Sequence, residues 1–390
     1  MPDYQKMYKT LFNDVTDAIT LLQNAQIKTE ELYMKDETPI VTLYENTVAS
    51  GRFLDYTLEE GVAQMNVKSQ LLKLLENNRD SHISGGALAR ELEVSRNAVW
   101  KAVESLRAEG YEISAVTNKG YRLENSGDIL SGAGIMGHLK TPGVFKVETR
   151  KSVTSTNTVL REMAAKGAPE GTVIAAEEQT AGKGRQGRSF HSPAGHGVYF
   201  SILLRPRLKA DHASLITSVA AVAAARAIEE ILGVQVGIKW VNDLFVGDKK
   251  VCGILTEAVF DMESGLVESV VTGIGINVTK PADGLPDGLE SVATALVDRS
   301  SGHDGERNRL IAATLDNFWE FYQDMPALKF LDEYRSRSII LGRDIYVLSG
   351  EDKKAARALE IDDECGLIVR YEDGVIATLS SGEVSVRVKG

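Results

Sequence analysis

The chain has 390 residues, 43% of them hydrophobic, so it can bury a large core and is long enough for two to three domains of roughly 150 residues each. Its 55 acidic side chains outnumber the 44 basic ones, and the net charge of −11 argues against a broad electrostatic grip on nucleic acid or an anionic membrane. The sequence shows neither a signal peptide nor an apolar run long enough to span a bilayer. We therefore expect a cytoplasmic globular protein without a membrane partner, in which any contact with DNA is local.

The two cysteines and six histidines form no metal-binding pattern. Cys252 and Cys365 lie far apart in the chain, and the histidines are scattered without an H-x-x-x-H pair or a nearby cysteine. We expect no protein-bound zinc site. Both cysteines are expected to be packing residues in a reducing compartment.

Residues 1–64 stand apart from the rest of the chain. They begin with an amphipathic helical pattern from Leu11 to Ala25, which is broken between Asp36 and Pro39. A new helical pattern opens at Met65, which resembles a second natural start. The segment is either an accessory element or an upstream stretch carried along, and its composition favours the second interpretation.

Residues 65–126 predict a winged helix-turn-helix. VKSQLLKLLENN indicates one helix, and the stretch from Ser84 to Tyr111 indicates two more, separated by a turn at Glu93 and Val94 with Ser95 as N-cap. Apolar residues from Leu88 to Leu106 recur at the spacing that locks two crossing helices together. The alternating segment YEISAVTNKGYRL that follows is typical of a two-stranded wing.

This domain has two possible roles. Winged helices bind DNA, and they also serve as protein-interaction modules; we favour DNA binding. Its nine basic and eight acidic side chains leave it near neutral, so we expect a dimer that reads two half-sites. The candidate DNA contacts are Ser95, Arg96, Asn97 and Lys101.

The remainder of the chain predicts an α/β unit followed by a small β-barrel. Strand-like runs, among them TVIAAEE, GVYFSILL, KVCGILTEAVF and VESVVTGIGINV, alternate with helical patterns over 213–232 and 306–325. Pro326 is expected to end the second of these helices. From about Ile339 onward, short strands separated by Gly- and Asp-containing turns indicate the barrel.

The loop AGKGRQGRS, residues 181–189, fits two phosphate-binding motifs imperfectly. Both the dinucleotide fingerprint and the phosphate loop need a helix to begin directly after the glycines, but here a turn and another strand follow. What remains is a mobile glycine loop whose Lys183, Arg185 and Arg188 could close over an anionic intermediate. The alternative is a solvated basic turn between two strands.

Four motifs decide between these interpretations: STN at 155–157, EEQTAGKGRQGR, KWVNDLFVGDKKVCGIL, and GIGIN at 273–277. Together they resemble the family of bifunctional biotin ligases that also repress the biotin operon. The similarity runs from Met65 to Gly390. It implies an α+β multidomain protein with a winged helix at 65–126, a central α/β domain of the biotin/lipoate ligase type at 127–337, and an SH3-like barrel at 338–390. Residues 1–64 remain an extension of unknown role.

The resemblance implies an enzyme that activates biotin with ATP to biotinyl-5′-AMP and transfers it to one lysine of a biotin carboxyl carrier domain. It also implies that the chain holding biotinyl-AMP binds operator DNA as a homodimer. Lys250, Arg185 and Arg188 would carry the catalysis by aligning the carboxylate and holding the phosphoryl oxygens. The implied biotin contacts are Ser155, Thr156, Asn157, Gln179, Lys183, Gly184, Arg185 and Lys250.

The implied ATP contacts are Arg188, Asn242, Asp243 and Asn277, with Asp243 also a candidate ligand of the Mg²⁺ that accompanies ATP. Taken alone, KWVND could equally be a strand that ends in a turn. Two other functions stay open: a lipoate-type ligase, since it shares this architecture, and a ligand-sensing transcription factor without ligase activity.

Overall fold

The computed structural model describes residues 67–124, 128–141, 143–206, 213–260, 266–281, 284–286, 288–298, 306–349, 352–380 and 384–388. The helical pattern expected between Leu11 and Ala25 lies outside these residues. Among the residues described, no helix is both long and apolar enough to cross a membrane.

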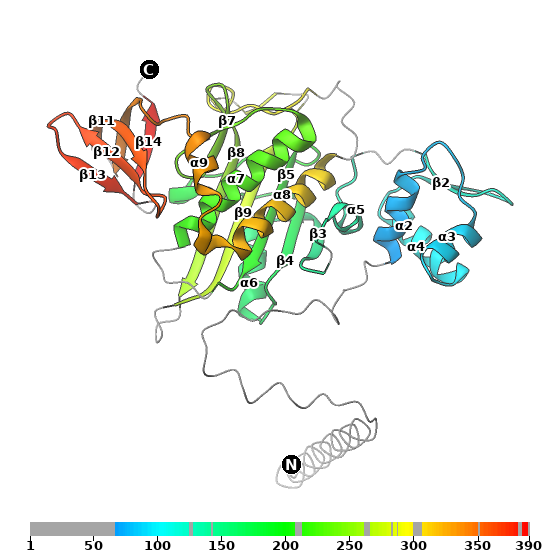
Figure 1. Ribbon diagram of the computed structural model, residues 1–390. Helices are drawn as coiled ribbons and strands as arrows, with labels where there is room; N and C mark the ends of the chain where they lie inside the picture. The colour runs from blue at the N-terminus through cyan, green and yellow to red at the C-terminus, as the bar shows by residue number, and fades with distance from the viewer. Residues whose placement is uncertain are drawn as a thin grey trace, which may run out of the picture. The chain divides into compact units, whose positions relative to one another are not determined.

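Three helices and a two-stranded hairpin form the winged helix near the start of the described chain (Figure 1). Ser84 and Ser95 cap the second and third helices, and each hydroxyl accepts a hydrogen bond from the backbone N–H three residues on, at 3.1 Å. The predicted N-cap at Ser95 is thereby confirmed. Glycine is required at Gly120 in the hairpin, because its φ is +108° and a Cβ would collide with the Ile83 carbonyl. The elements are α2 (Val67–Glu76), α3 (Gly85–Glu91), α4 (Arg96–Ala108), β1 (Ile113–Val116) and β2 (Gly120–Leu123).

A seven-stranded sheet in the order β3-β4-β5-β9-β8-β7-β6 forms the centre of the next part of the chain. β3 and β4 run parallel, and the other neighbouring pairs are antiparallel. The four strand-like runs predicted from the sequence correspond to β4, β5, β8 and β9. Sequence patterning missed β3, because this charged edge strand leaves most of its side chains partly or fully exposed. The bounds are β3 (Lys146–Val153), β4 (Thr172–Gln179), β5 (Gly197–Leu204), β6 (Gly237–Lys239), β7 (Asp243–Val246), β8 (Lys249–Phe260) and β9 (Val267–Asn277).

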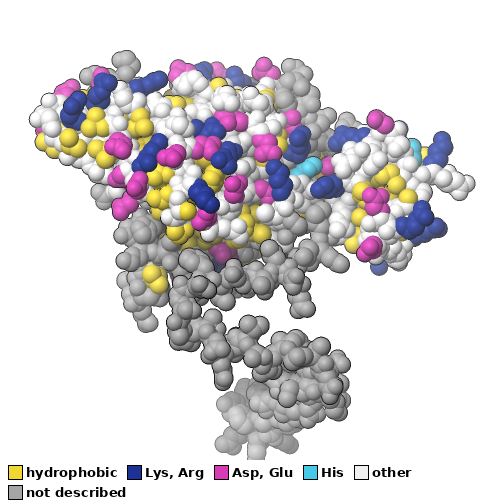
Figure 2. Space-filling view, viewed as in Figure 1, with side chains coloured by type: hydrophobic (Ala, Val, Ile, Leu, Met, Phe, Trp, Pro, Cys, Tyr) yellow, Lys and Arg dark blue, Asp and Glu magenta, His cyan; other side chains and the backbone are white. Residues whose placement is uncertain are grey.

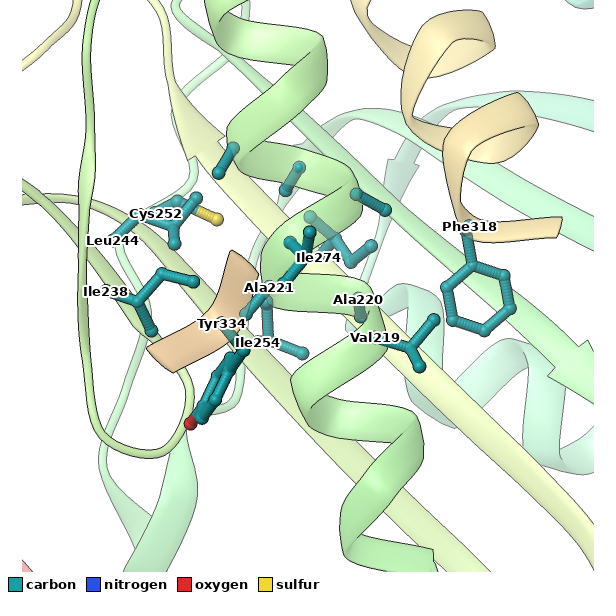
Figure 3. Close-up of a cluster of buried hydrophobic side chains, with 14 of the residues drawn as sticks. Val219, Ala220, Ala221, Ile238, Leu244, Cys252, Ile254, Ile274, Phe318 and Tyr334 are labelled. Atoms are coloured by element: carbon teal, nitrogen blue, oxygen red, sulfur yellow. The ribbon is translucent and has the colours of Figure 1, made fainter. Parts of the chain in front are cut away.

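Helices cover this sheet and complete the main core. α7 (Ala213–Leu232) has the bounds that the sequence predicts, whereas α8 (Glu306–Gln323) ends two residues earlier than predicted because a separate 3-10 turn containing Pro326 follows. Small side chains of α7, including Ala220 and Ala221, let the helix approach the sheet closely (Figure 3). The shorter helices are α5 (Gly132–His138), α6 (Thr156–Ala165) and α9 (Leu331–Ser336).

The last strands form a five-stranded antiparallel sheet in the order β13-β12-β11-β10-β14, as expected for the small barrel. Its turn at Cys365 touches the central part, because the indole N–H of Trp240 donates a 2.9 Å hydrogen bond to the Cys365 carbonyl. Cys252 and Cys365 are free and buried, so the prediction that they are packing residues is confirmed. The strands are β10 (Asp344–Ser349), β11 (Asp352–Ile361), β12 (Leu367–Tyr371), β13 (Ile376–Leu379) and β14 (Val384–Val388).

Candidate active site

The glycine loop connects β4 to β5 and, as predicted, no α-helix follows it. It folds back on itself: the Gly184 N–H donates to the Arg188 carbonyl at 2.7 Å, and the Phe190 N–H donates to the Gly182 carbonyl at 2.8 Å. One 3-10 turn, Arg185–Gly187, forms its tip. This geometry excludes both helix-dependent phosphate motifs.

A narrow hollow of about 50 Å³ lies beside this loop, and we call it the closed end. Four parts of the chain meet there: the start of α6, the end of β4 with the glycine loop that follows it, strand β8, and strand β9. All eight residues predicted to contact biotin line it, namely Ser155, Thr156, Asn157, Gln179, Lys183, Gly184, Arg185 and Lys250.

One side of the closed end is a hydrogen-bonded chain around Gln179. The side-chain oxygen of Gln179 accepts from the Thr156 N–H at 2.9 Å and from the Thr156 hydroxyl at 3.2 Å. Its amide nitrogen donates to the Ser192 hydroxyl at 2.9 Å. Ser155 precedes α6, but its hydroxyl makes no capping bond, so it is free of the helix backbone. The Gln179 amide is thus held in a single orientation.

The other side is organised by Asn157, which is buried. Its amide nitrogen donates to Glu257 at 2.8 Å and to the Leu255 carbonyl at 3.2 Å, and its oxygen accepts from the Ser201 hydroxyl at 2.6 Å. A side chain on Gly273 of β9 would collide with this amide, so glycine is needed there. The Asn157 side chain is therefore fixed by neighbours on three strands.

The ring of Phe190 covers the glycine floor of the hollow. A Cβ on Gly275 would lie 2.6 Å from this ring, and one on Gly253 would lie 3.2 Å from it. With about 50 Å³, the closed end has room for about four water molecules as it stands. The Phe190 ring thus bounds the hollow, and it belongs to the segment after the glycine loop rather than to the sheet.

Lys250 lines the closed end and also two further spaces beside it, which are described below. Its ammonium lies 2.6 Å from Asp243 and 6.0 Å from the centre of the Phe190 ring. The backbone of Lys250 is fixed as well, because its N–H donates to the Val292 carbonyl at 2.9 Å and its carbonyl accepts from the Thr294 N–H at the same distance. The residue thus places one positive charge at the junction between two spaces.

The KWVND turn supplies polar groups next to this lysine. As the structural interpretation of the motif predicts, it links β6 to β7, and the peptide bond between Trp240 and Val241 is cis. The Asn242 amide nitrogen donates to the Ile254 carbonyl at 2.8 Å, and its oxygen accepts from Arg185 at 3.2 Å. Partial burial lowers the pKa of Arg185, while the carboxylate of Asp243 opposes that effect.

Beyond Lys250, the site opens into a cavity of about 620 Å³, which we call the open end. Three of the four predicted ATP contacts line it: Arg188, Asp243 and Asn277. The fourth, Asn242, lines the closed end and a smaller hollow of about 150 Å³ between the two, which Arg185 and Arg188 also line. Further residues of the open end, absent from the sequence prediction, include Phe190, Lys239, Phe245 and Asp248.

The structure brings every predicted catalytic, biotin and ATP residue into these adjoining spaces. The predicted DNA contacts form a separate group on the winged helix, where Arg96, Asn97 and Lys101 are exposed on α4, and the Ser95 hydroxyl caps that helix. Sequence reasoning missed Phe190, Ser192, Ser201 and Glu257. Only Phe190 and Ser192 carried a usable signal, since both directly follow the glycine loop.

Three family models match the chain. The "Biotin/lipoate A/B protein ligase family" matches residues 149–277, an "HTH domain" matches 67–122, and the "Biotin protein ligase C terminal domain" matches 340–387. The first covers the glycine loop and the KWVND turn, and the second covers α2, α3, α4 and the hairpin.

Characterised relatives align over most of the chain. The "Bifunctional ligase/repressor BirA" of Bacillus subtilis is 37% identical over 315 residues, covering 79% of this chain and 95% of the relative. The protein with the same description from Escherichia coli is 27% identical over 330 residues, covering 82% and 97%. A solved structure of the biotin protein ligase from Aquifex aeolicus in complex with biotin and ATP is 29% identical, with a TM-score of 0.53, covering 63% of this chain and 99% of that one.

Proposed function

The chain belongs to the biotin protein ligase family, among its bifunctional ligase/repressors, and we propose from this that its cleft joins biotin to ATP and passes the biotinyl group to a carrier lysine. Biotinylation and repression are the activities of this family, and the chain carries both the ligase domain and the helix-turn-helix. The acceptor is a lysine of a biotin carboxyl carrier domain. We set the domain boundaries at 65–126, 127–337 and 338–390.

One observation supports this proposal above the others: the eight residues proposed to contact biotin line one narrow hollow, with Lys250 at its mouth. The hydroxyl and amide groups of Ser155, Thr156 and Asn157 suit the polar edge of the ureido ring. The glycine floor and the Phe190 ring suit its apolar fused rings. The biotin carboxylate would then lie at Lys250.

In the first step, a carboxylate oxygen of biotin attacks the α-phosphorus of ATP, and the bond to the β-phosphate oxygen breaks to release pyrophosphate. Lys250 aligns the attacking carboxylate and reduces its repulsion from the phosphate. Arg185 and Arg188, which both line the hollow between the two ends, hold the oxygens of the α-phosphate. In the second step the carrier amine attacks the mixed anhydride, loses a proton, and releases AMP.

Mg²⁺ is expected to arrive with ATP, and Asp243 suits it. One oxygen of this carboxylate is buried and accepts no hydrogen bond of ordinary geometry, although Lys250 lies close to it. Among the residues described, no group of three or more His, Cys, Asp or Glu side chains could hold a metal by itself. Asp243 would therefore be a single protein ligand, and the ion would supply charge neutralisation for the triphosphate.

The repressor activity depends on the same intermediate. We propose that biotinyl-AMP orders the glycine loop, that chains with an ordered loop form a homodimer, and that the dimer places two winged helices on a palindromic operator. A carrier domain that consumes the intermediate then relieves repression.

Isotope exchange between pyrophosphate and ATP tests the first step. Exchange that requires added biotin, and that lipoate does not support, is the expected result. Exchange supported by lipoate would favour the lipoate-type ligase, and absence of exchange would favour a sensor without ligase activity. An operator titration at fixed salt, with and without biotin plus ATP, tests the repressor step; equal affinities would contradict the coupling.

A further inference from the structure

Helix α4 buries one face in the winged-helix core and leaves the other exposed. Val99, Val103 and Leu106 are fully buried, so the rotation of the helix is fixed. The opposite face carries Arg96, Asn97, Trp100, Lys101 and Glu104, all of them exposed.

Trp100 is a large apolar side chain on an otherwise polar helix surface. It is 51% exposed, whereas Trp240 is buried and Trp319 packs against the main core. Among the residues described, Phe260 is the one other large aromatic that is comparably exposed. An indole left in water gives up a large hydrophobic contribution to stability, which a binding partner would restore.

Arg96 is directed back toward α3. A Cβ on Gly86 would lie 2.8 Å from its guanidinium, so this group packs directly over the α3 backbone. Arg90 lines the same open hollow between the two helices. Two cations at the flank of a recognition helix suit DNA phosphates, which fix the position of the protein without reading sequence. Base reading is then left to the residues that project from the middle of the exposed face.

Asn97 and Trp100 both lie on that exposed face. They are three residues apart on an α-helix, so their side chains are neighbours on its surface. In the major groove, asparagine pairs with the two exposed edge groups of adenine, and an apolar side chain contacts the C5-methyl group of thymine. The two side chains together fit a patch of A·T base pairs.

We propose that Asn97 and Trp100 form a reading pair for A·T base pairs in the major groove, with Trp100 on the thymine methyl group. This proposal rests on the repressor function given above and adds the class of sequence that the repressor selects. DNA is favoured over a protein partner because Lys101 and Arg96 flank the indole. On the face shown in Figure 2, Lys and Arg side chains also gather on the part that carries α3 and α4.

Uracil substitution tests this contact directly, because uracil is thymine without the C5-methyl group. The probe is a duplex selected from a random library by the full-length chain in the presence of biotin and ATP. Each thymine is replaced by uracil in turn, and affinity is measured at constant salt. For the wild-type chain, at least one replacement in each half-site should weaken binding about fourfold, which corresponds to one methyl group removed from contact.

The Trp100→Ala variant should bind the thymine and uracil duplexes equally, and Trp100→Phe should restore part of the discrimination. Trp319→Phe, a change in the ligase part, serves as the matched control and should discriminate like the wild type. Biotin-dependent pyrophosphate exchange should be unchanged in Trp100→Ala, which shows that the ligase part is folded, and retained binding of both duplexes shows the same for the winged helix.

Wild-type binding that no uracil replacement weakens would overturn the proposal, as would undiminished discrimination by Trp100→Ala, because in either case the indole does not contact a thymine methyl group. If the wild-type chain enriches no duplex, the repressor function itself fails, and the reading pair fails with it.

Discussion

The closed and open ends of the cleft are built in different ways. At the closed end, polar side chains are bonded to one another: Gln179 joins Thr156 to Ser192, and Asn157 joins Ser201 to Glu257. The open end is a cavity of about 620 Å³ whose lining includes both positive and negative side chains, among them Lys239, Asp243 and Arg188. The polar side chains of the closed end are fixed by hydrogen bonds, whereas charged side chains of both signs surround the wide space of the open end.

This difference matches the two ligands proposed for the cleft. A neutral ureido ring is recognised through hydrogen bonds, which depend on direction. Its partners therefore need fixed positions, and a network of mutual hydrogen bonds provides them. A triphosphate is recognised mainly by charge, which acts over a longer range and tolerates mobile partners. We therefore expect substitutions at the closed end to affect biotin binding selectively, and substitutions at the junction to affect the chemical step.

The largest effect is expected at the junction. Lys250→Ala should lower pyrophosphate exchange about a thousandfold, because it removes a charged contact that strengthens in the transition state. Lys249→Ala, one residue earlier on the same strand and outside the three hollows, is the matched control and should exchange normally. Wild-type-like exchange by Lys250→Ala would remove this residue from the mechanism.

A smaller and more selective loss is expected at the closed end. Asn157→Ala removes three hydrogen bonds and leaves Glu257 and Ser201 without this partner. Biotin affinity should fall at least about tenfold with the KM for ATP unchanged, because the damage is confined to one end. Equal losses for both substrates would contradict the separation of the two ends.

Arg185→Gly should slow activation less than Lys250→Ala does, because Arg188 still holds the α-phosphate, and it should also weaken retention of the intermediate. Without this cation the loop holds the phosphate less tightly, so biotinyl-AMP should escape about tenfold faster and label lysines on unrelated proteins. Arg150→Gly, a change on edge strand β3 at a residue that lines none of the three hollows, is the control. Labelling confined to the carrier lysine would show that Arg185 does not hold the loop closed.

The smallest effect is expected at the outer wall of the open end. Asn277 donates a 3.1 Å hydrogen bond to the Thr294 carbonyl and so supports that wall. Asn277→Ala should raise the KM for ATP about threefold without changing biotin affinity. A change in biotin affinity of that size would indicate that the wall also shapes the closed end.

The sequence alone predicted most of the fold, because long elements carry periodic patterns. α7 was predicted with its observed bounds, since twenty mostly small and apolar residues leave no alternative to a buried helix. β3 was missed because an edge strand exposes its charged side chains, and α6 because it is short and its buried face includes Thr156 and Asn157. The order in which the strands pair within the sheet could not be predicted, because hydrophobic patterns describe only residues close together in the sequence.

The candidate site was predicted where its residues lie in compact motifs. Ser201 was missed because it is a single polar residue inside an apolar strand, and Glu257 because it lies 100 residues from Asn157, with which it pairs. Phe190 was missed because it lies just after the end of the glycine-loop motif, at residues 181–189. The biotin residues were assigned from resemblance, and their convergence on one hollow is a property of the folded chain.

Calorimetric titration of the two substrates separately is the most direct test of the contrast between the two ends. Biotin should bind the nucleotide-free chain at one site, because the polar walls of the closed end are in place without a nucleotide. A non-hydrolysable ATP analogue should bind the biotin-free chain at least about tenfold more weakly than the biotin-bound chain, and by linkage it should raise the affinity for biotin by the same factor without being required for biotin binding. Biotin binding that requires the analogue, together with tight binding of the analogue alone, would contradict the account.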